Sequence, residues 1–428
     1  MSGTGAVRPA RLPFSLITKP TGAACNLDCS YCFFLSKEVL WGPESQRMSA
    51  ETLDRFVASY LDAQPDGEVT IGWQGGEPTM RGLAFFREAF QLAEQYRRPG
   101  QQVQHAIQTN GTLLDDDWGE FLAANNFLVG LSVDGPAALH DAYRVNKAGR
   151  GTYDQVRRGW DVLARHHVET NILCTVNAAN AGQPLEVYRH FRDELGARFI
   201  QFIPIVERVE AGHEDEAERG FRNDQGEHVL YRQAGEQVTS RTVAADAWGR
   251  FLSAIFDEWV VRDVGEVFVQ HFDVTLSALF GQYSLCVHSP ECGSAIAMEH
   301  NGDVYSCDHY VEPDFRLGNI ATDSFAELLA QPKQRAFGRD KRTTLPRQCL
   351  DCPVRWVCNG GCPKDRFAIT PDGEPGLNYL CAGYYSFFTR IWPAMETMRD
   401  LIQNGRPPAD IMSFRGESDS GPVHRSGV

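Results

Sequence analysis

This sequence lacks the features that would place the protein in a membrane or on nucleic acid. No apolar run approaches the ~18 residues of a membrane span. Acidic residues outnumber basic residues by 56 to 41, giving a formal net charge of −15, and we recognise no basic stripe in the chain. Since nucleic acid attracts positively charged surfaces, we expect no nucleic-acid partner. Because no apolar run is long enough to span a bilayer, we also expect no membrane partner. The hydrophobic content of 43% is ordinary for a globular protein with a large core.

We also expect no export signal in this chain. Its opening residues, MSGTGAVRPARLP, contain no hydrophobic h-region. Disulfides form in oxidising compartments, so the twelve cysteines of this chain indicate metal ligation in a reducing cytoplasm.

What the sequence does contain is ordered cysteines, and the first set decides most of the interpretation. Cys25, Cys29 and Cys32 lie in CNLDCSYC, directly after the apolar run FSLITKP. Three thiolates on one short loop can bind three irons of a cubane iron–sulfur cluster, which leaves the fourth iron open. A structural zinc wants four protein ligands, and no fourth Cys or His lies near the loop. Zinc and disulfides are therefore alternatives that the spacing and the compartment disfavour.

Short apolar runs alternate with helix-like segments through residue 206. In the first clear helix, Ser49 is placed to cap the N-terminus, and Ala50, Leu53, Val57 and Leu61 share an apolar face. Six β–α units with nearly continuous apolar strands predict an α/β fold, a partial (β/α)6 barrel with a parallel sheet. Ligands bind at the carboxyl ends of such strands. The predicted strands are 14–19, 68–73, 104–109, 128–133, 170–176 and 198–206.

The pattern changes after the sixth strand. Residues 207–240 are rich in Glu and Gly and predict a surface insertion, either a lid or a disordered loop. The last residues, from 404, predict a disordered tail. The expected domains are 1–206, the partial barrel; 207–241, the acidic insertion; 242–285, a bridging helix and strand; 286–392, a cysteine-rich domain; and 393–428, a helix end and the tail.

CNLDCSYC has the CxxxCxxC form, and with the six β–α units it resembles the radical S-adenosylmethionine (SAM) enzymes. In that family SAM chelates the open iron, and reduction of the cluster cleaves SAM to a 5′-deoxyadenosyl radical. Read locally, Gly75-Gly76 is a turn and Arg144 is an exposed charge at a helix start. The resemblance instead implies SAM contacts from Tyr31, Gln74, Gly76, Glu77, Asn110, Ser132, Arg144 and the strand end Ile205-Val206.

Eight more cysteines follow residue 285. Read locally, CLDCPVRWVCNGGC is typical of a zinc ribbon, and zinc at one site stays an alternative. The whole arrangement resembles the SPASM domain of radical SAM maturases, which carries two auxiliary 4Fe–4S clusters. The resemblance implies three 4Fe–4S clusters in all, together with SAM. Its auxiliary ligand sets are Cys286, Cys292, Cys307 and Cys362, and Cys349, Cys352, Cys358 and Cys381. The left-over Cys174 is interpreted as a buried core residue.

The segment AIAMEHNGDVYSCDHYVEP predicts a β-hairpin that turns at Asn301-Gly302. It delivers Cys307 and Asp308 together, so a carboxylate beside a cluster can take a proton from a substrate. The alternative is a turn carboxylate or a hydrogen-bond acceptor. CDHYVEPDFRLGNI, the cysteine spacing and QFIPIVE are similar to anaerobic sulfatase-maturating enzymes, over most of residues 12 to 390. In that family the Asp after this cysteine is the catalytic proton acceptor, a role that the resemblance gives to Asp308.

The resemblance implies a radical SAM oxidoreductase that converts a Cys or Ser of a sulfatase precursor to Cα-formylglycine without oxygen. It implies an unfolded or nascent sulfatase chain as substrate and a flavodoxin- or ferredoxin-type electron donor. Another SPASM peptide maturase, which forms thioether or carbon–carbon crosslinks, would share every cysteine named. A non-catalytic zinc or iron–sulfur scaffold is the third alternative, and it leaves the open three-cysteine loop unexplained. The acidic insertion is longer than in compact members of the family and bears on how a substrate docks.

Overall fold

The computed structural model describes residues 13–42 and 46–416. The prediction about an export signal concerns residues 1–13 and lies almost entirely outside the described residues. Within them, no helix combines the length and the apolar character needed to cross a lipid bilayer.

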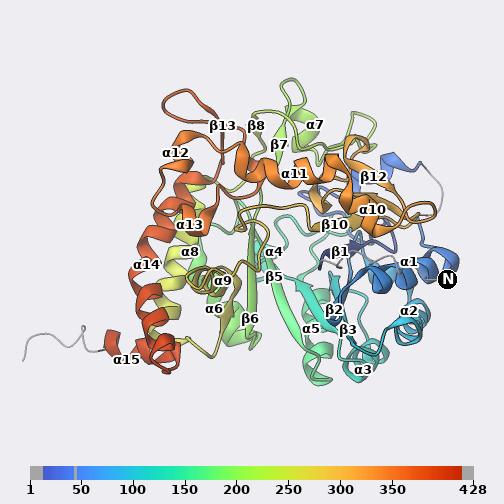
Figure 1. Cartoon of the computed structure of the whole chain (residues 1–428), viewed down its shortest axis with the longest axis horizontal. Helices are drawn as coiled ribbons and strands as arrows, with labels where there is room; N and C mark the ends of the chain where they lie inside the picture. The colour runs from blue at the N-terminus through green and yellow to red at the C-terminus, as the bar shows by residue number, and fades with distance from the viewer. Residues whose placement is uncertain (1–12, 43–45, 417–428) are drawn as a thin grey trace, which may run out of the picture.

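A ten-stranded sheet forms the centre of the molecule, in the order β12-β11-β10-β1-β2-β3-β4-β5-β6-β9 (Figure 1). The six predicted strands run parallel to one another in chain order, which confirms the predicted α/β architecture. Fully buried side chains such as Ile71, Val129 and Ile172 account for their apolar sequences. These strands are β1 (Ser15–Thr18), β2 (Gly67–Trp73), β3 (Gln101–Thr109), β4 (Leu128–Ser132), β5 (Thr170–Val176) and β6 (Phe199–Pro204).

Amphipathic helices cover the outer face of these strands. The Ser49 side chain accepts the Thr52 N–H and caps the first of them, as predicted. Leu53, Val57 and Leu61 are buried, whereas Ala50 is exposed, so the buried face begins one turn later than predicted. The helices are α1 (Ala50–Ala63), α2 (Leu83–Tyr96), α3 (Asp116–Ala124), α4 (Ala137–His140), α5 (Tyr153–Arg165) and α6 (Pro184–Arg189), with the π-helical turn η3 (His190–Glu194).

Four strands that the barrel prediction did not contain extend the sheet at both ends. β9 (Phe268–Val269) pairs with β6, and β10 (Ala295–Met298) pairs in parallel with β1. The predicted hairpin is confirmed: β10 and β11 (Asp303–Tyr305) are antiparallel and joined through Asn301 and Gly302, whose φ is +85°. β12 (Arg316–Asn319) completes this edge. The downstream cysteine region therefore shares one sheet with the barrel.

Two long helices pack side by side beyond β6 (Figure 1). They are α8 (Ala245–Arg262) and α14 (Cys381–Gln403), and α14 runs across the expected domain division after residue 392. The tail prediction was wrong for residues 404–416, which form η7 (Pro408–Asp410) and α15 (Ile411–Gly416). Ile411 is buried in the main core, so this segment has an apolar anchor. Residues 417–428 lie outside the described residues.

The remaining elements are short or belong to the cysteine-rich region. The helices are η1 (Leu35–Leu40), η2 (Pro78–Arg81), α7 (Glu214–Glu218), α9 (Gln270–Ala278), η4 (Asp308–Tyr310), η5 (Pro313–Phe315), α10 (Phe325–Ala330), α11 (Pro332–Thr343), α12 (Arg347–Leu350), α13 (Arg355–Cys358) and η6 (Pro363–Asp365). The strands are β7 (Arg208–Val209), β8 (Gln237–Val238), β13 (Ala368–Ile369) and β14 (Pro375–Leu377).

The acidic insertion is folded, so the disorder alternative was wrong. β7 and β8 pair, α7 lies between them, and Val209, Phe221 and Tyr231 belong to a small apolar cluster of its own. Polar contacts fix the insertion over the segment that follows β1. Its Arg222 contacts both carboxylate oxygens of Asp28 at 2.9 and 3.1 Å, and the Lys37 ammonium donates to the Tyr231 carbonyl at 2.6 Å.

A buried ion pair attaches the insertion to the end of β6. Arg241 Nε donates to the Glu207 carboxylate at 2.9 Å, and its other nitrogens donate to the carbonyls of Ala217 and Glu218. Both side chains are 4% exposed. Removing one partner of such a pair leaves an uncompensated buried charge.

We therefore expect Arg241→Met to lower stability by about 3–5 kcal/mol. The measurement is the melting temperature of the purified protein, together with the rate of proteolysis within residues 208–240. Arg250→Met is the matched control, because Arg250 pairs with Asp246 at the surface, where ion pairs contribute little. Equal melting temperatures for the two variants would contradict the role given to Arg241.

Candidate active site

The carboxyl ends of β1, β2 and β3 bring three predicted segments to one edge of the sheet. The cysteine loop follows β1, Gly75-Gly76-Glu77 follows β2, and Asn110 follows β3. Cys25, Cys29 and Cys32 are each partly buried and none forms a disulfide. The Asn110 amide donates to Asn26 Oδ1 at 2.9 Å and lies 3.8 Å from Cys25 Sγ. The loop is therefore held by its neighbours.

The two glycines allow the backbone after β2 to pack directly on the cysteine loop. The N–H groups of Gly76 and Glu77 donate to the carbonyls of Gly22 and Ala24 at 2.8 and 2.9 Å. A Cβ on Gly76 would lie 2.0 Å from the Ala24 carbonyl oxygen. The resemblance implied SAM contact for Gly76, and the contact that the structure describes is with the loop that carries Cys25.

Glu77 has its carboxylate fully engaged inside the protein. Its oxygens accept the hydroxyls of Thr79 and Thr109 at 2.6 and 2.7 Å and the Asn110 N–H at 2.7 Å. Burial raises the pKa of Glu77, although these donors oppose the shift. Glu77 thus joins the loops after β2 and β3, a structural task that its place directly after Gly75-Gly76 did not reveal.

Tyr31 and Arg144 meet at Asp134, a residue that the sequence analysis missed. Asp134 Oδ2 accepts from the Tyr31 hydroxyl and from Arg144 Nε, and Oδ1 accepts the Thr175 N–H at 2.9 Å. Arg144 is buried, so the exposed-charge alternative was wrong. Burial lowers the pKa of Arg144, but Asp134 and Tyr31 outweigh it and the pKa lies above its ordinary value. The available signal was position, since Asp134 directly follows Val133 at the end of β4.

The other predicted SAM contacts lie along the same edge. The Ser132 hydroxyl, at the end of β4, accepts from Gln108 Nε2 at 3.0 Å. The Gln74 N–H donates to the Thr18 carbonyl, and its buried side-chain oxygen has no hydrogen-bond partner in the part of the chain that the structure describes. Ile205 and Val206, just after β6, are 7% and 4% exposed. Cys174 is fully buried in β5, as predicted.

Electrostatic interactions between the thiols relate the cysteines in three groups, although the described residues contain no group of three or more His, Cys, Asp or Glu side chains arranged to hold a metal ion. Burial raises the pKa of Cys25, and Cys32 and Cys29 raise it further. Burial also raises the pKa of Cys307, which Cys362 and Cys286 raise further, and Cys286 acts likewise on Cys292. A third group is formed by Cys358, whose pKa is raised by burial and then by Cys381, Cys349 and Cys352. These groups have the same members as the ligand sets implied by the resemblance. Thiols in sets of three, four and four are a donor set that fits iron–sulfur clusters.

The pairing of β10 with β1 places Asp308 beside the cysteine loop. Lys19, directly after β1, donates its backbone N–H to the Met298 carbonyl of β10 at 2.9 Å. Its ammonium contacts Asp308 Oδ1 as an ion pair and lies 3.5 Å from the centre of the Phe34 ring. Burial alone would raise the pKa of Asp308, but Lys19 opposes this and the pKa lies below its ordinary value. Asp308 is therefore held as a carboxylate by its contact with Lys19.

Lys19 is buried among further charged groups that the sequence analysis did not single out. Its side chain is 1% exposed, and the wholly buried carboxyl of Glu299, which follows β10, feels its charge. Burial raises the pKa of Glu299, and neither of its oxygens has a hydrogen-bond partner among the described residues. Lys37 is also buried, which lowers its pKa to about 8. The Lys that precedes Pro20 could have been noticed only by knowing that β10 lies beside β1.

The contact at Gly76 yields a prediction. We expect Gly76→Ala to displace the Ala24 carbonyl and to lower the iron content after anaerobic reconstitution at least severalfold. Gly182→Ala is the control, because a Cβ on the exposed Gly182 meets no atom within 4 Å. Full iron content in Gly76→Ala, at the level of Gly182→Ala, would contradict the packing role.

Comparisons with known proteins agree with this geometry. Residues 20–189 match the Radical SAM superfamily model, and residues 290–353 match the model of an iron-sulfur cluster-binding domain, SPASM. A serine-type anaerobic sulfatase-maturating enzyme of Bacteroides thetaiotaomicron is 43% identical, over 94% of this chain and 95% of that protein. A cysteine-type anaerobic sulfatase-maturating enzyme of Clostridium perfringens is 32% identical, over 91% of this chain and all of that protein.

A solved structure shows the same fold. Native anSMEcpe with bound AdoMet and Cp18Cys peptide is 30% identical, with a TM-score of 0.77, over 91% of this chain and 99% of that one. The matched families imply 4Fe–4S clusters and SAM as cofactors, as predicted. The resemblance seen in the sequence is confirmed: this chain belongs to the anaerobic sulfatase-maturating enzymes, a family of radical SAM enzymes that carry a SPASM domain.

Proposed function

We propose that this enzyme oxidises one Ser or Cys of a sulfatase precursor to Cα-formylglycine without oxygen. The observation that carries the proposal is the position of Lys19. Its ammonium contacts Asp308, and its charge also acts on Cys32 of the first cysteine group. A proton acceptor thus lies close to the loop where radical chemistry would begin, at the edge of the sheet where ligands bind.

The residues present fit the cofactors that the family requires. Three 4Fe–4S clusters would be held by the three cysteine groups, with SAM at the first group, which has only three thiols. Ser132 and Val206 lie at or just after strand ends, and Tyr31 and Arg144 meet at Asp134 just after β4, so these side chains would surround SAM. When bound, these cofactors supply the radical that removes a hydrogen atom from the substrate Cβ and a sink for one electron.

Asp308 would take the proton from the substrate hydroxyl or thiol. Conversion of –CH2OH to –CHO removes two hydrogens, one as the abstracted atom and one as this proton, and it leaves one electron to be removed. With Cys as substrate the product is a thioaldehyde, which water converts to the aldehyde with release of hydrogen sulfide. Lys19 is a positioning residue in this scheme, because it orients the Asp308 carboxylate and keeps it ionised.

The alternatives are less well supported. A scaffold without activity does not fit a chain whose relatives are enzymes. Crosslinking maturases share the cysteine pattern, but the relatives at 43% and 32% identity are sulfatase-maturating enzymes. The solved structure of anSMEcpe holds a peptide, which supports an unfolded or nascent sulfatase chain as substrate. We further propose a cytoplasmic setting and a flavodoxin- or ferredoxin-type electron donor.

The direct test is anaerobic turnover of a sulfatase-type peptide whose target Ser carries two deuterium atoms on Cβ. We expect mass spectrometry to find one deuterium in 5′-deoxyadenosine and one in the peptide aldehyde. The same peptide with Cys at the target position should give aldehyde and sulfide if both residues are substrates. A crosslinked peptide, or 5′-deoxyadenosine without deuterium, would overturn the proposal.

Substitutions at the ion pair should separate SAM cleavage from product formation. Asp308→Asn should still cleave SAM but form aldehyde about 100-fold more slowly or worse, the range expected on loss of a general base. Lys19→Met should show the same uncoupling, because Asp308 loses the one ion-pair partner that it has among the described residues, and Lys19→Arg should restore part of the yield. Iron content serves as the folding control. If Lys19→Met gave the wild-type yield of aldehyde, the positioning role of Lys19 would be contradicted.

A further inference from the structure

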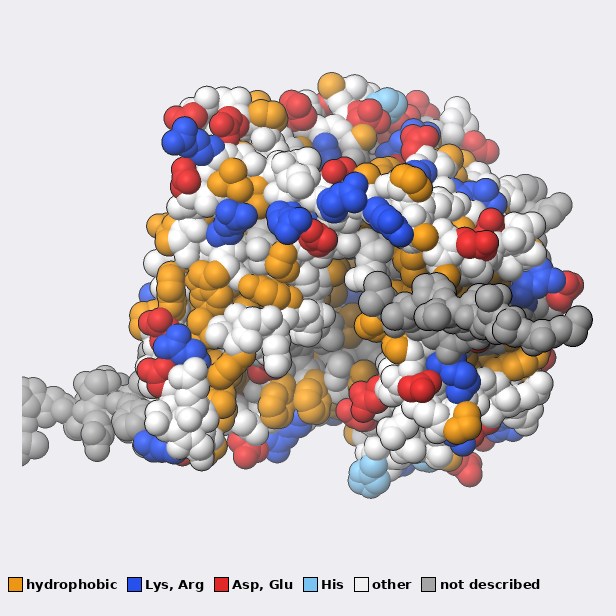
Figure 2. Space-filling view, in the orientation of Figure 1, with side chains coloured by type: hydrophobic (Ala, Val, Ile, Leu, Met, Phe, Trp, Pro, Cys, Tyr) orange, Lys and Arg blue, Asp and Glu red, His pale blue; other side chains and the backbone are white. Residues whose placement is uncertain are grey.

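One part of the surface is basic although the chain as a whole is acidic. Residues 332–358 contain seven Lys or Arg and two Asp, a net charge of +5 in a chain of net charge −15. Figure 2 shows a row of Lys and Arg side chains where α11 crosses the same view in Figure 1. The sequence analysis recognised no basic stripe, and that reading was wrong, because the acidic excess elsewhere in the chain hides this local one.

Two of these cations have no role inside the described protein. Arg335 and Arg339 are exposed, four residues apart on one face of α11, and their side chains have no hydrogen-bond or ion-pair partner among the described residues. Lys341 on the same helix differs, since it is buried and donates to the carbonyls of Cys286 and Val287. Lys341 thus supports the loop that carries Cys286, whereas the exposed side chains of Arg335 and Arg339 are free to contact another protein.

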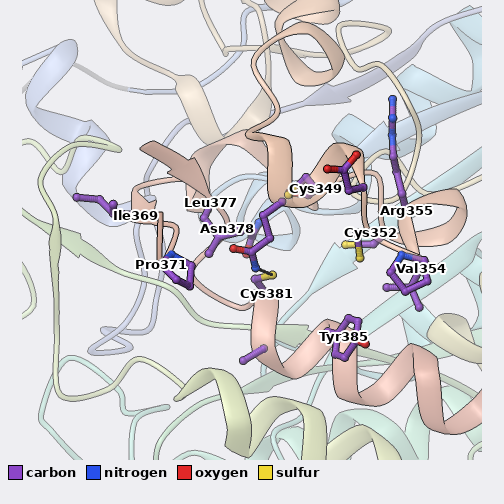
Figure 3. Close-up of a pocket in the computed structure, with 16 residues that line it drawn as sticks. Cys349, Cys352, Val354, Arg355, Ile369, Pro371, Leu377, Asn378, Cys381 and Tyr385 are labelled. Atoms are coloured by element: carbon purple, nitrogen blue, oxygen red, sulfur yellow. Dashed lines mark hydrogen bonds between the residues drawn. The ribbon is translucent and has the colours of Figure 1, made fainter. Parts of the chain in front are cut away.

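The basic helix leads directly to an open cavity that holds the third cysteine group. This cavity, about 630 Å³ in volume, is lined by Cys349, Cys352, Cys358 and Cys381. Figure 3 shows the side chains of Cys349, Cys352 and Cys381 gathered around it, with Arg355 extending away from them. α11 contacts the cavity wall through Arg366, which donates to the carbonyls of Lys341 and Gly360.

Exposed apolar side chains surround the mouth of the cavity. Leu350, Ile369 and Tyr385 are 46%, 61% and 47% exposed, and Ile369 and Tyr385 line the cavity itself. In Figure 2 apolar side chains gather on the left of the same face, beside the basic row. An apolar centre beside free charges of one sign is the usual anatomy of a transient protein interface.

We propose that the basic face of α11 and the apolar mouth of this cavity form the docking surface for an acidic one-electron carrier protein in its oxidised form. This inference rests on the proposed function, because oxidation of the substrate leaves one electron on the enzyme in each turnover. The carrier is reduced by that one electron, and no atom is transferred. A carrier of ferredoxin or flavodoxin type, with a negatively charged surface, matches Arg335 and Arg339 in charge.

The test is binding of an oxidised, acidic plant-type [2Fe–2S] ferredoxin to the reconstituted holoenzyme by biolayer interferometry at 20 mM and 200 mM salt. We expect the double variant Arg335→Glu and Arg339→Glu to weaken binding about tenfold at low salt and to flatten its salt dependence. The control is Arg158→Glu with Arg262→Glu. Both residues are exposed, lie on α5 and α8, and have no side-chain hydrogen-bond or ion-pair partner among the described residues. This control makes the same change in net charge and should keep wild-type affinity.

Two further measurements keep the outcome decisive. Ile369→Ser should weaken ferredoxin binding without changing its salt dependence, and turnover of the sulfatase peptide with dithionite should stay unchanged in the α11 variant. Equal binding by the α11 variant and wild type, or an equal loss in the control, would overturn the docking surface. So would an impaired dithionite reaction, which would assign α11 to substrate binding, or tight binding of a 20-nucleotide RNA to the same face. Because the binding measurement contains no sulfatase peptide, it can fail while formylglycine formation stands.

Discussion

The parallel pairing of β1 with β10 is the constraint on which the rest of the site depends. β1 leads into the cysteine loop, and β10 leads into the hairpin that carries Cys307 and Asp308. The two strands are more than 270 residues apart in the chain, and each is too short to be stable alone. In one sheet, the carboxyl ends of β1 and β10 lie at the same edge, and the chain that returns through β11 brings Asp308 into contact with Lys19, directly after β1. The SPASM region therefore continues the sheet of the barrel. The cysteine loop and Asp308 belong to one site and not to two separate ones.

Lys19 lies at this shared edge and carries a buried positive charge. A buried ammonium loses several kcal/mol of hydration energy, which must be offset by charge and by its surroundings. Asp308, the Phe34 ring and the charge of Glu299 provide that compensation. The burial of Glu299 is opposed in turn by His300, whose Nδ1 lies 3.8 Å from its carboxylate, and by Lys19. The acidic insertion packs against the same region. Its Arg222 binds Asp28 and its Tyr231 carbonyl accepts from Lys37, and these contacts hold both ends of the segment from Asp28 to Lys37. Charges that would be costly to bury one by one are thus retained as a group.

The features that depend on neighbouring residues alone were predicted correctly from the sequence. Six apolar strands, the Ser49 cap and the Asn301-Gly302 turn follow from side-chain periodicity and turn chemistry, and the structure has them all. The cysteine sets came from family resemblance, because spacing alone could not show that Cys362 crosses to the group of Cys307. Asp134, Lys19 and Glu299 were missed, since each acquires its role from a partner on a distant strand. Residues 207–240 and 404–416 were misjudged for a related reason: polar, glycine-rich composition conceals a few anchors, such as Tyr231 and Ile411, that are enough to order a segment.

The most direct test of this account is anomalous diffraction at the iron edge from crystals grown without oxygen. The account predicts an iron cluster at Cys25, Cys29 and Cys32 and another at Cys286, Cys292, Cys307 and Cys362. The Lys19–Asp308 ion pair should lie between the two clusters, in a sheet that contains both β1 and β10. A zinc-edge signal at the first cysteine group, or iron there with Asp308 turned away from Lys19 and from the loop, would contradict it.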